Sequence, residues 1–241
     1  LDAPTDESRT LRTRPDVAFQ SDVERTGYWP DQSVPDTVEL GWSVPGINKG
    51  EHDAATASPL YYDGAVIAPG DTGIVRSITP EGEENWTASL VSSGRGTHST
   101  PVIVDDYLFT AGYDGAAYAF DVDTGDLIWR TTVADAIGSS PAYYDGIVYV
   151  ATEFYDPSGG MAALDAATGA PLWEDNRMTD HAHSITGIDT DVGRFAAGCN
   201  DGSLYVWNLD AVRNDDGTAF AGTFETGGAI KGPVCMYDGL A

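Results

Sequence analysis

The chain has 241 residues, 41% of them hydrophobic, and its 38 acidic and 12 basic side chains give a formal net charge of −26. A surface this acidic argues against nucleic acid and anionic membranes as partners, and no apolar run approaches the roughly 18 residues of a membrane-spanning helix. Because the acids are spread through a chain rich in Val, Ile, Tyr and Trp, a disordered acidic tail is excluded too.

Residues 1–16 are polar and aperiodic, which predicts a flexible leader. The chain begins at Leu1 rather than Met, so we expect that an upstream segment was removed or not included. From residue 17 to residue 241, short apolar runs alternate with turn signals, which predicts one all-β domain. The two cysteines, Cys199 and Cys235, lie 36 residues apart, and we predict two buried free thiols, with a disulfide as the alternative.

Three markers recur with one period. Tryptophans are spaced by 44, 43 and 44 residues, at Trp42, Trp86, Trp129 and Trp173. A proline follows a small residue at Ser58-Pro59, Thr100-Pro101, Ser140-Pro141 and Gly232-Pro233. Asp-Gly hairpin signals follow the proline strands at Tyr62-Asp63-Gly64, Tyr144-Asp145-Gly146 and Tyr237-Asp238-Gly239. Each repeat then divides into four short strands, and four antiparallel strands per period of about 43 residues predict a β-propeller blade.

The predicted blades span about residues 37–90, 91–133, 134–177 and 178–224, and residues 225–241 supply the first strand of a partial fifth blade. An eight-bladed ring needs about 340 residues at this period. An unpaired apolar inner strand is an aggregation hazard. We therefore expect the remaining blades of a seven- or eight-bladed propeller in sequence beyond Ala241, with a closed four-bladed ring or an assembly of half-propellers as the alternatives.

Residues 119–129 and 163–173 share the pattern Ala-x-Asp-x-x-Thr-Gly-x-x-x-Trp, with degraded copies ending at Trp86 and Phe220. The pattern resembles the tryptophan-docking motif of PQQ-like (pyrroloquinoline-quinone, quinoprotein-type) propeller repeats, and Arg25-Thr-Gly-Tyr28 resembles that family's first-blade segment. The resemblance covers residues 17–241. It implies that each tryptophan packs on the alanine of its own motif and on the Thr-Gly turn of a neighbouring blade, a structural role for Trp86, Ala119, Gly125, Trp129, Ala163, Gly169 and Trp173.

Two groups of residues are candidates for binding. His98 lies three residues before Pro101, and His183 lies three residues before Thr186, which occupies the position of that proline in another repeat. This places both histidines near the mouth of the central channel as candidate ligand contacts. At such separated blades we expect them too far apart to share one ion. The acidic blade-4 loop offers Asp210, Asp215 and Asp216 to a cation, although it lacks the oxygen spacing of an EF-hand.

Enzymes of the resembled family use PQQ, Ca²⁺, a catalytic aspartate and a vicinal disulfide. The sequence has no Cys-Cys pair and no assignable catalytic base, so no catalytic or cofactor-binding residue is predicted. We predict a non-catalytic binding or scaffold module, extracellular or on the cell surface, that binds a protein or small molecule through its loops and channel mouth. Its acidic composition resembles that of salt-in halophiles.

Two other functions remain open. The chain could form the N-terminal part of a PQQ- and Ca²⁺-dependent alcohol or sugar dehydrogenase, with PQQ and Ca²⁺ as cofactors in that case. It could instead bind glycans or metal ions at its acidic loops.

Overall fold

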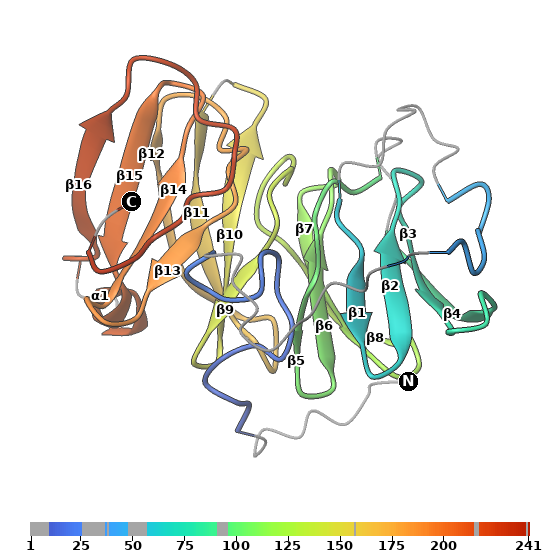
Figure 1. The fold of residues 1–241 in the computed structure, drawn as a ribbon. Coiled ribbons are helices and arrows are strands. Elements are labelled where there is room, and N and C mark those ends of the chain that lie inside the picture. Colours follow the sequence, from blue (N-terminus) through green and yellow to red (C-terminus); the bar gives the residue numbers. More distant parts are fainter. Residues whose placement is uncertain are drawn as a thin grey trace.

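A computed structural model describes residues 10–25, 37, 39–47, 57–90, 96–156, 158–214, 217–239 and 241. Within these ranges the chain forms four antiparallel sheets of four strands, and each strand pairs with the next strand along the sequence. Figure 1 shows the sheets side by side in chain order, from blade 1 (cyan) to blade 4 (orange to red). The predicted all-β architecture of four-stranded propeller blades is confirmed.

The strands fall at equivalent places in the four repeats. Blades 1 and 2 consist of β1 (Leu60–Tyr62), β2 (Ala65–Pro69), β3 (Ile74–Ile78), β4 (Glu84–Ser89), β5 (Val102–Val104), β6 (Tyr107–Ala111), β7 (Ala116–Asp121) and β8 (Leu127–Thr132). Blades 3 and 4 consist of β9 (Ala142–Tyr144), β10 (Ile147–Phe154), β11 (Ser158–Asp165), β12 (Pro171–Met178), β13 (Gly187–Asp189), β14 (Arg194–Gly198), β15 (Ser203–Asn208) and β16 (Phe220–Glu225).

The fourth strand of each blade has the largest share of exposed residues. All residues of β5 and β13 are buried, whereas β4 and β8 alternate between exposed and buried positions. The first strands therefore lie at the inner edge of the blades and the fourth strands at the outer edge. The core fills the space between adjacent sheets, where it includes Phe109, Tyr143 and Tyr149, each 1% exposed or less.

Hydroxyl groups link the inner strands of successive blades. The Ser58 amide donates to Thr100 Oγ1 (2.8 Å), and the Thr100 amide donates to Ser140 Oγ (2.9 Å). The recurring small residue before proline therefore joins one blade to the next. The proline that follows has no N–H group to leave unpaired at this crowded edge.

The tryptophans of blades 1 and 2 pack on the turn of the following blade. Trp86 and Trp129 are each 8% exposed. A Cβ added to Gly125 would lie 2.6 Å from Trp86 Cε3, and one added to Gly169 would lie 2.6 Å from Trp129 Cδ2. Both glycines also have positive φ, of 73° and 72°. Glycine is thus required twice over at these turns, by backbone conformation and by the approach of the indole.

The alanines and aspartates of the repeated motif have separate structural roles. Ala119 is directly opposite Trp129 in the sheet, and Ala163 is opposite Trp173; both alanines are fully buried. Asp121 Oδ1 accepts hydrogen bonds from the amide (2.9 Å) and hydroxyl (3.1 Å) of Thr124. The acidic residue here closes the turn.

Blade 4 departs from the pattern. The sequence aligns Phe220 with the docking tryptophans, but in the sheet Gly222 pairs with Val206 at that position and Phe220 pairs with Trp207. The turn is replaced by α1 (Leu209–Asn214), a helix where we expected a loop. One and a half turns are too short to give a helical period in the sequence. Trp173 packs edge-on to Trp207 and Phe195 instead of on a glycine turn.

The predicted flexible leader is partly packed. Residues 1–9 lie outside the described residues, but Asp16 donates its amide to Ile103 O (2.8 Å), and the Asp145 amide donates to Thr13 O (2.7 Å). The segment from residue 10 to residue 25 thus lies against the inner strands (Figure 1). The polar composition of the segment predicted flexibility. It could not reveal the residues that hold the segment in place, because these lie far along the chain.

Arg25 fixes the end of this segment. Its side chain donates to the carbonyls of Phe19 (2.8 Å), Pro141 (3.1 Å) and Thr186 (3.2 Å), and the residue is 2% exposed. Burial lowers its pKa to about 10, against the opposing effect of nearby Asp22. The guanidinium remains charged at neutral pH and joins blades 3 and 4 to the N-terminal segment.

The segment after β16 takes the place expected for the start of a fifth blade. No strand is assigned to the described residues after Glu225. The amides of Val234 and Met236 nevertheless donate to Ile185 O and Glu24 O, both at 3.0 Å. The side chains of Val234 and Met236 pack on Ala196 of β14, so this segment covers the open face of blade 4.

Candidate functional site

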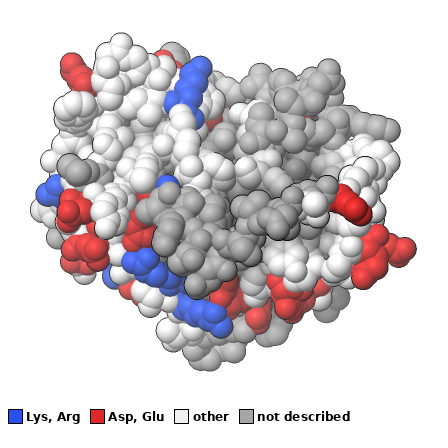
Figure 2. All heavy atoms as spheres, viewed as in Figure 1, with Lys and Arg blue, Asp and Glu red and all other residues white. Residues whose placement is uncertain are grey.

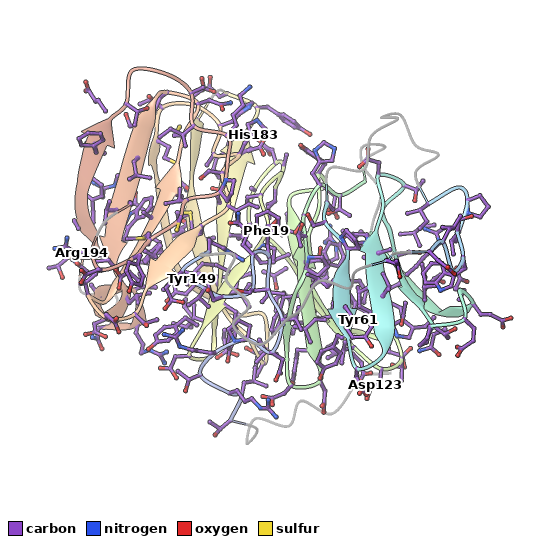
Figure 3. All side chains as sticks on the ribbon, in the orientation of Figure 1. Phe19, Tyr61, Asp123, Tyr149, His183 and Arg194 are labelled. Atoms are coloured by element: carbon purple, nitrogen blue, oxygen red, sulfur yellow. The ribbon has the colours of Figure 1, made fainter. Side chains whose placement is uncertain are left out.

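The turns and connections at one end of the blades form a surface that we call the end face. It consists of the turns between second and third strands and the connections that lead into each first strand. Figure 3 shows His183 at this end, whereas Asp123 lies at the opposite end. A cavity of about 520 Å³ opens on the end face, lined by Phe19, Ser58, His98, Thr100, Tyr113, Gly138, Ser140, His183, Ile185 and Lys231.

His98 and His183, predicted as channel-mouth residues, both line this cavity. His98 shares a hydrogen bond of 2.9 Å between its Nδ1 and the Tyr113 hydroxyl, and its Nε2 lies 3.6 Å from Asp71 Oδ1. Asp71 is 2% exposed. Blade 2 thus contributes an imidazole that faces a buried carboxylate of blade 1.

The same arrangement recurs between blades 3 and 4. Val66 of blade 1 pairs with Ile78, and Val148 of blade 3 pairs with Leu164, so the two valines occupy equivalent positions in their sheets. Asp71 lies five residues after Val66, and Glu153 lies five residues after Val148. The two carboxylates are therefore equivalent as well. Glu153 is 5% exposed, and its Oε1 lies 3.1 Å from Nδ1 of His183. The Gly138 amide donates to the same oxygen (2.9 Å).

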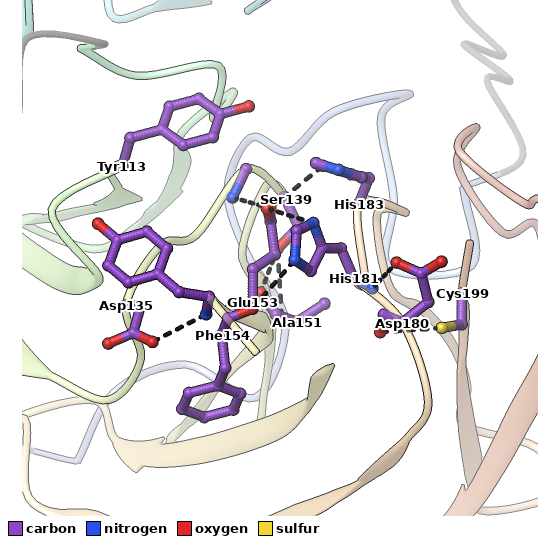
Figure 4. Close-up of polar contacts among 12 residues, drawn as sticks. Tyr113, Asp135, Ser139, Ala151, Glu153, Phe154, Asp180, His181, His183 and Cys199 are labelled. Carbon is purple, nitrogen blue, oxygen red and sulfur yellow. Dashed lines mark hydrogen bonds and ion pairs between the residues drawn. The ribbon is translucent and has the colours of Figure 1, made fainter. Parts of the chain in front are cut away.

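A second histidine joins this pair, as Figure 4 shows. His181 Nδ1 lies 3.8 Å from Glu153 Oε2, and His181 Nε2 is 3.0 Å from the carbonyl oxygen of Phe154. The rings of His181 and His183 meet edge-on with centroids 5.8 Å apart. One donor atom from each of Glu153, His181 and His183 lies within 4.8 Å of the others. In the described part of the chain, this is the one group of three side chains able to hold a metal ion.

Gly138 connects the two arrangements. An added Cβ at this residue would lie 2.6 Å from Glu153 Oε1, 2.9 Å from the Tyr113 hydroxyl and 3.1 Å from His183 Nδ1. The polar groups of blades 2, 3 and 4 therefore converge on one point, which only a residue without a side chain leaves open.

Of the predicted cation-loop residues, only Asp210 lies in the described part of the chain. Asp210 is exposed in the first turn of α1, while Asp215 and Asp216 lie outside the described residues. Cys199 is buried and Cys235 is exposed, and both are free thiols, so the prediction of two buried thiols is wrong for Cys235. Burial raises the pKa of Cys199 to about 11.

Glu153 and His181 were missed by the sequence reasoning. Glu153 is a lone acid at the end of the apolar run Val148-Tyr-Val-Ala-Thr152, and such an acid needs a partner once buried. His181 and His183 are two residues apart, and alternate residues of an extended segment project to the same side. These two signals together could have indicated the group.

Comparisons with known proteins agree on the repeat. Residues 71–227, well over half of the chain, match the family described as outer membrane protein assembly factor BamB. The BamB protein of Yersinia pestis is 25% identical over 185 residues, which cover 68% of this chain and 46% of that protein. The quinohemoprotein alcohol dehydrogenase ADH-IIG of Pseudomonas putida is 32% identical over 112 residues, 42% of this chain and 15% of that enzyme.

A solved structure shows the same fold. The quinohemoprotein alcohol dehydrogenase of Comamonas testosteroni superimposes with a TM-score of 0.67 at 15% identity, over 96% of this chain and 45% of that protein. The chain thus spans less than half the length of these relatives. The repeated motif, the four blades and the match over residues 71–227 show that the chain belongs to the PQQ-like β-propeller repeat family that includes BamB.

Proposed function

We propose that the chain is a non-catalytic binding module of an extracytoplasmic protein adapted to high salt, and that the end face carries its binding site. The cavity of about 520 Å³ supports this proposal most directly, because it gathers Ser58, Thr100, Ser140 and His183 from four successive blades. Side chains from several blades around one opening are typical of a site for a protein segment or small molecule. BamB relatives are named as assembly factors, which favours a scaffold role.

A dehydrogenase is the second candidate, because several relatives are quinohemoprotein alcohol dehydrogenases. The end face fits Ca²⁺ poorly. Calcium takes six to eight oxygen ligands, whereas Glu153 is faced by the two imidazoles of His181 and His183. This nitrogen-rich donor set does not fit a site for Ca²⁺ and PQQ.

The extracytoplasmic and high-salt parts of the proposal rest on charge and sequence. Figure 2 shows acidic side chains at the lower left and lower right of one face, with a group of basic side chains between them. The net charge of −26 creates self-repulsion that is screened over about 10 Å at 0.1 M salt but over about 3 Å near 1 M salt. No helix in the described ranges is long and apolar enough to cross a membrane.

Site-specific photo-crosslinking tests the binding role. A photoreactive phenylalanine analogue replaces Tyr155, 79% exposed in the β10–β11 turn of the end face, in cells that express the chain. The matched control places the analogue at Leu127, 54% exposed on an outer strand. We expect one recurring crosslinked partner from Tyr155 that is absent from Leu127. Equal labelling at both positions would count against the end face, and dye reduction after loading with PQQ and Ca²⁺ would overturn the non-catalytic role.

A further inference from the structure

We propose that Glu153, His181 and His183 bind a divalent transition-metal ion, with Zn²⁺ as the best match, whose remaining coordination position faces the end-face cavity. This proposal does not depend on the end face binding a protein. It rests on the geometry of the three side chains, on the hydrogen atom that His181 must carry, and on the groups that orient the ligands.

The spacing of the donor atoms suits one ion. Bonds of about 2.0–2.2 Å in tetrahedral geometry place neighbouring ligand atoms roughly 3.4 Å apart. Glu153 Oε1 is 3.1 Å from His183 Nδ1, and Glu153 Oε2 is 3.8 Å from His181 Nδ1. All three donors lie within 4.8 Å of one another, so small side-chain rotations bring them to one centre.

The hydrogen bond of His181 leaves a lone pair directed at a carboxylate. The Phe154 carbonyl can only accept, so the His181 Nε2 that lies 3.0 Å from it carries the hydrogen. In the neutral ring Nδ1 is then unprotonated and lies 3.8 Å from Glu153 Oε2. At 3.8 Å, Nδ1 and Oε2 are too far apart for an N–H···O hydrogen bond. A metal ion about 2 Å from each atom spans the gap.

Backbone groups hold two of the ligands from behind. Metal-bound histidines commonly donate their other ring N–H to a carbonyl, which fixes the tautomer and the ring orientation. The Phe154 carbonyl has this role for His181, and the Gly138 amide orients Glu153 through Oε1 (2.9 Å). Glu153 is therefore held before any ion arrives, which lowers the cost of ordering the site.

The donor set and its exposure decide which ion fits. Two imidazoles and one carboxylate match Zn²⁺ and its neighbours in the first transition row, and not Mg²⁺ or Ca²⁺. The side chains of His181 and His183 are 34% and 30% exposed, so an ion can enter from solvent. Because Gly138 and His183 also line the cavity, a fourth ligand reaches the ion from that side.

Blade 2 supplies an internal control. His98 faces Asp71 as His183 faces Glu153, but Gly96 stands where blade 4 has His181. This pair lacks the second imidazole. A substitution of His98 on the same cavity should therefore leave the proposed ion in place.

Binding of Zn²⁺ and Co²⁺ is measured by calorimetry on the whole chain in molar KCl, with excess Mg²⁺ to saturate surface carboxylates. We expect one ion per chain and, with Co²⁺, the intense visible bands of a four-coordinate, nitrogen-ligated site. Glu153→Gln and His181→Gln should each weaken binding by at least about 100-fold, since loss of an orienting neighbour alone costs 10–100-fold. His98→Gln should change it by less than about twofold.

A second measurement needs no variant. Bound Zn²⁺ should protect His181 and His183 of the native chain from acylation by diethylpyrocarbonate, read by peptide mapping, while the labelling of His98 stays unchanged. The proposal is overturned if Zn²⁺ leaves the labelling of His181 and His183 unchanged. It is equally overturned if His181→Gln binds Zn²⁺ as tightly as the native chain, or if His98→Gln weakens binding as much as His181→Gln does.

Discussion

Truncation of Trp129 should remove much of the stability of the blade 2–blade 3 contact. The indole is 8% exposed, packs on Gly169, and donates from Nε1 to Ala166 O (2.9 Å). Burial of roughly 200 Å² at about 25 cal/mol per Å² stabilises by about 5 kcal/mol. Measured costs of removing a buried Trp or Phe side chain are about 3–5 kcal/mol. Trp129→Ala should therefore cost about 3–5 kcal/mol in the free energy of unfolding.

The assay is urea unfolding at constant high KCl, since urea leaves the ionic strength unchanged. Leu127→Ala is the matched control, because Leu127 is 54% exposed on the same strand and should cost less than about 1 kcal/mol. If Trp129→Ala does not fold, Trp129→Phe keeps an aromatic ring, loses the Nε1–H bond and should cost about 1–3 kcal/mol. A loss below about 1 kcal/mol for Trp129→Ala, or equal to that of Leu127→Ala, would refute the docking argument.

Three further outcomes are expected. The urea midpoint should fall when KCl is lowered from 1 M to 0.1 M, because the charge of −26 is then screened over about 10 Å rather than about 3 Å; an unchanged midpoint would argue against salt adaptation. Burial opposes ionisation of Asp201, but hydrogen bonds led by that from the Tyr205 hydroxyl lower its pKa from 3.8 to about 2. A carboxyl with a depressed folded-state pKa stabilises the fold above its unfolded pKa, and this stability is lost as pH falls toward 2. Asp201→Asn should therefore flatten the unfolding free energy between pH 4 and pH 2, and an unaltered pH profile would contradict the assignment. A disulfide reagent at pH 8 should label Cys235 quickly and Cys199 slowly, since Cys199 is buried with its pKa raised to about 11; two equally fast thiols would show that Cys199 is accessible.

The architecture could be predicted because it repeats. A tryptophan every 43 or 44 residues and the Asp-x-x-Thr-Gly turn report contacts that every blade makes with its neighbour. Prediction failed where the contact occurs once. α1 replaces a single turn, and residues 10–25 bind strand edges that lie about 90 to 165 residues further along the chain.

The site was predictable in part for the same reason. His98 and His183 stand at equivalent places in two repeats and could be named from spacing, and both line one cavity. Glu153 and His181 do not recur in the same way. Blade 2 has Tyr113 at the position equivalent to Glu153 and Gly96 at the position equivalent to His181. The pairing of a carboxylate with an imidazole from the next blade depends on the angle between the two blades. No local pattern in a single sequence reports that angle.

Arg25 has a consequence for the order in which the chain is made. Two of the three carbonyls that receive its side chain belong to Pro141 and Thr186, which are synthesised 116 and 161 residues later. At about 5–20 residues per second, the ribosome needs roughly 8–30 s to reach the second of these partners. During synthesis the Arg25 side chain therefore stays in water until Thr186, at the start of blade 4, has been made. Formation of this buried contact would mark a late step of folding, after the first three blades have already been made.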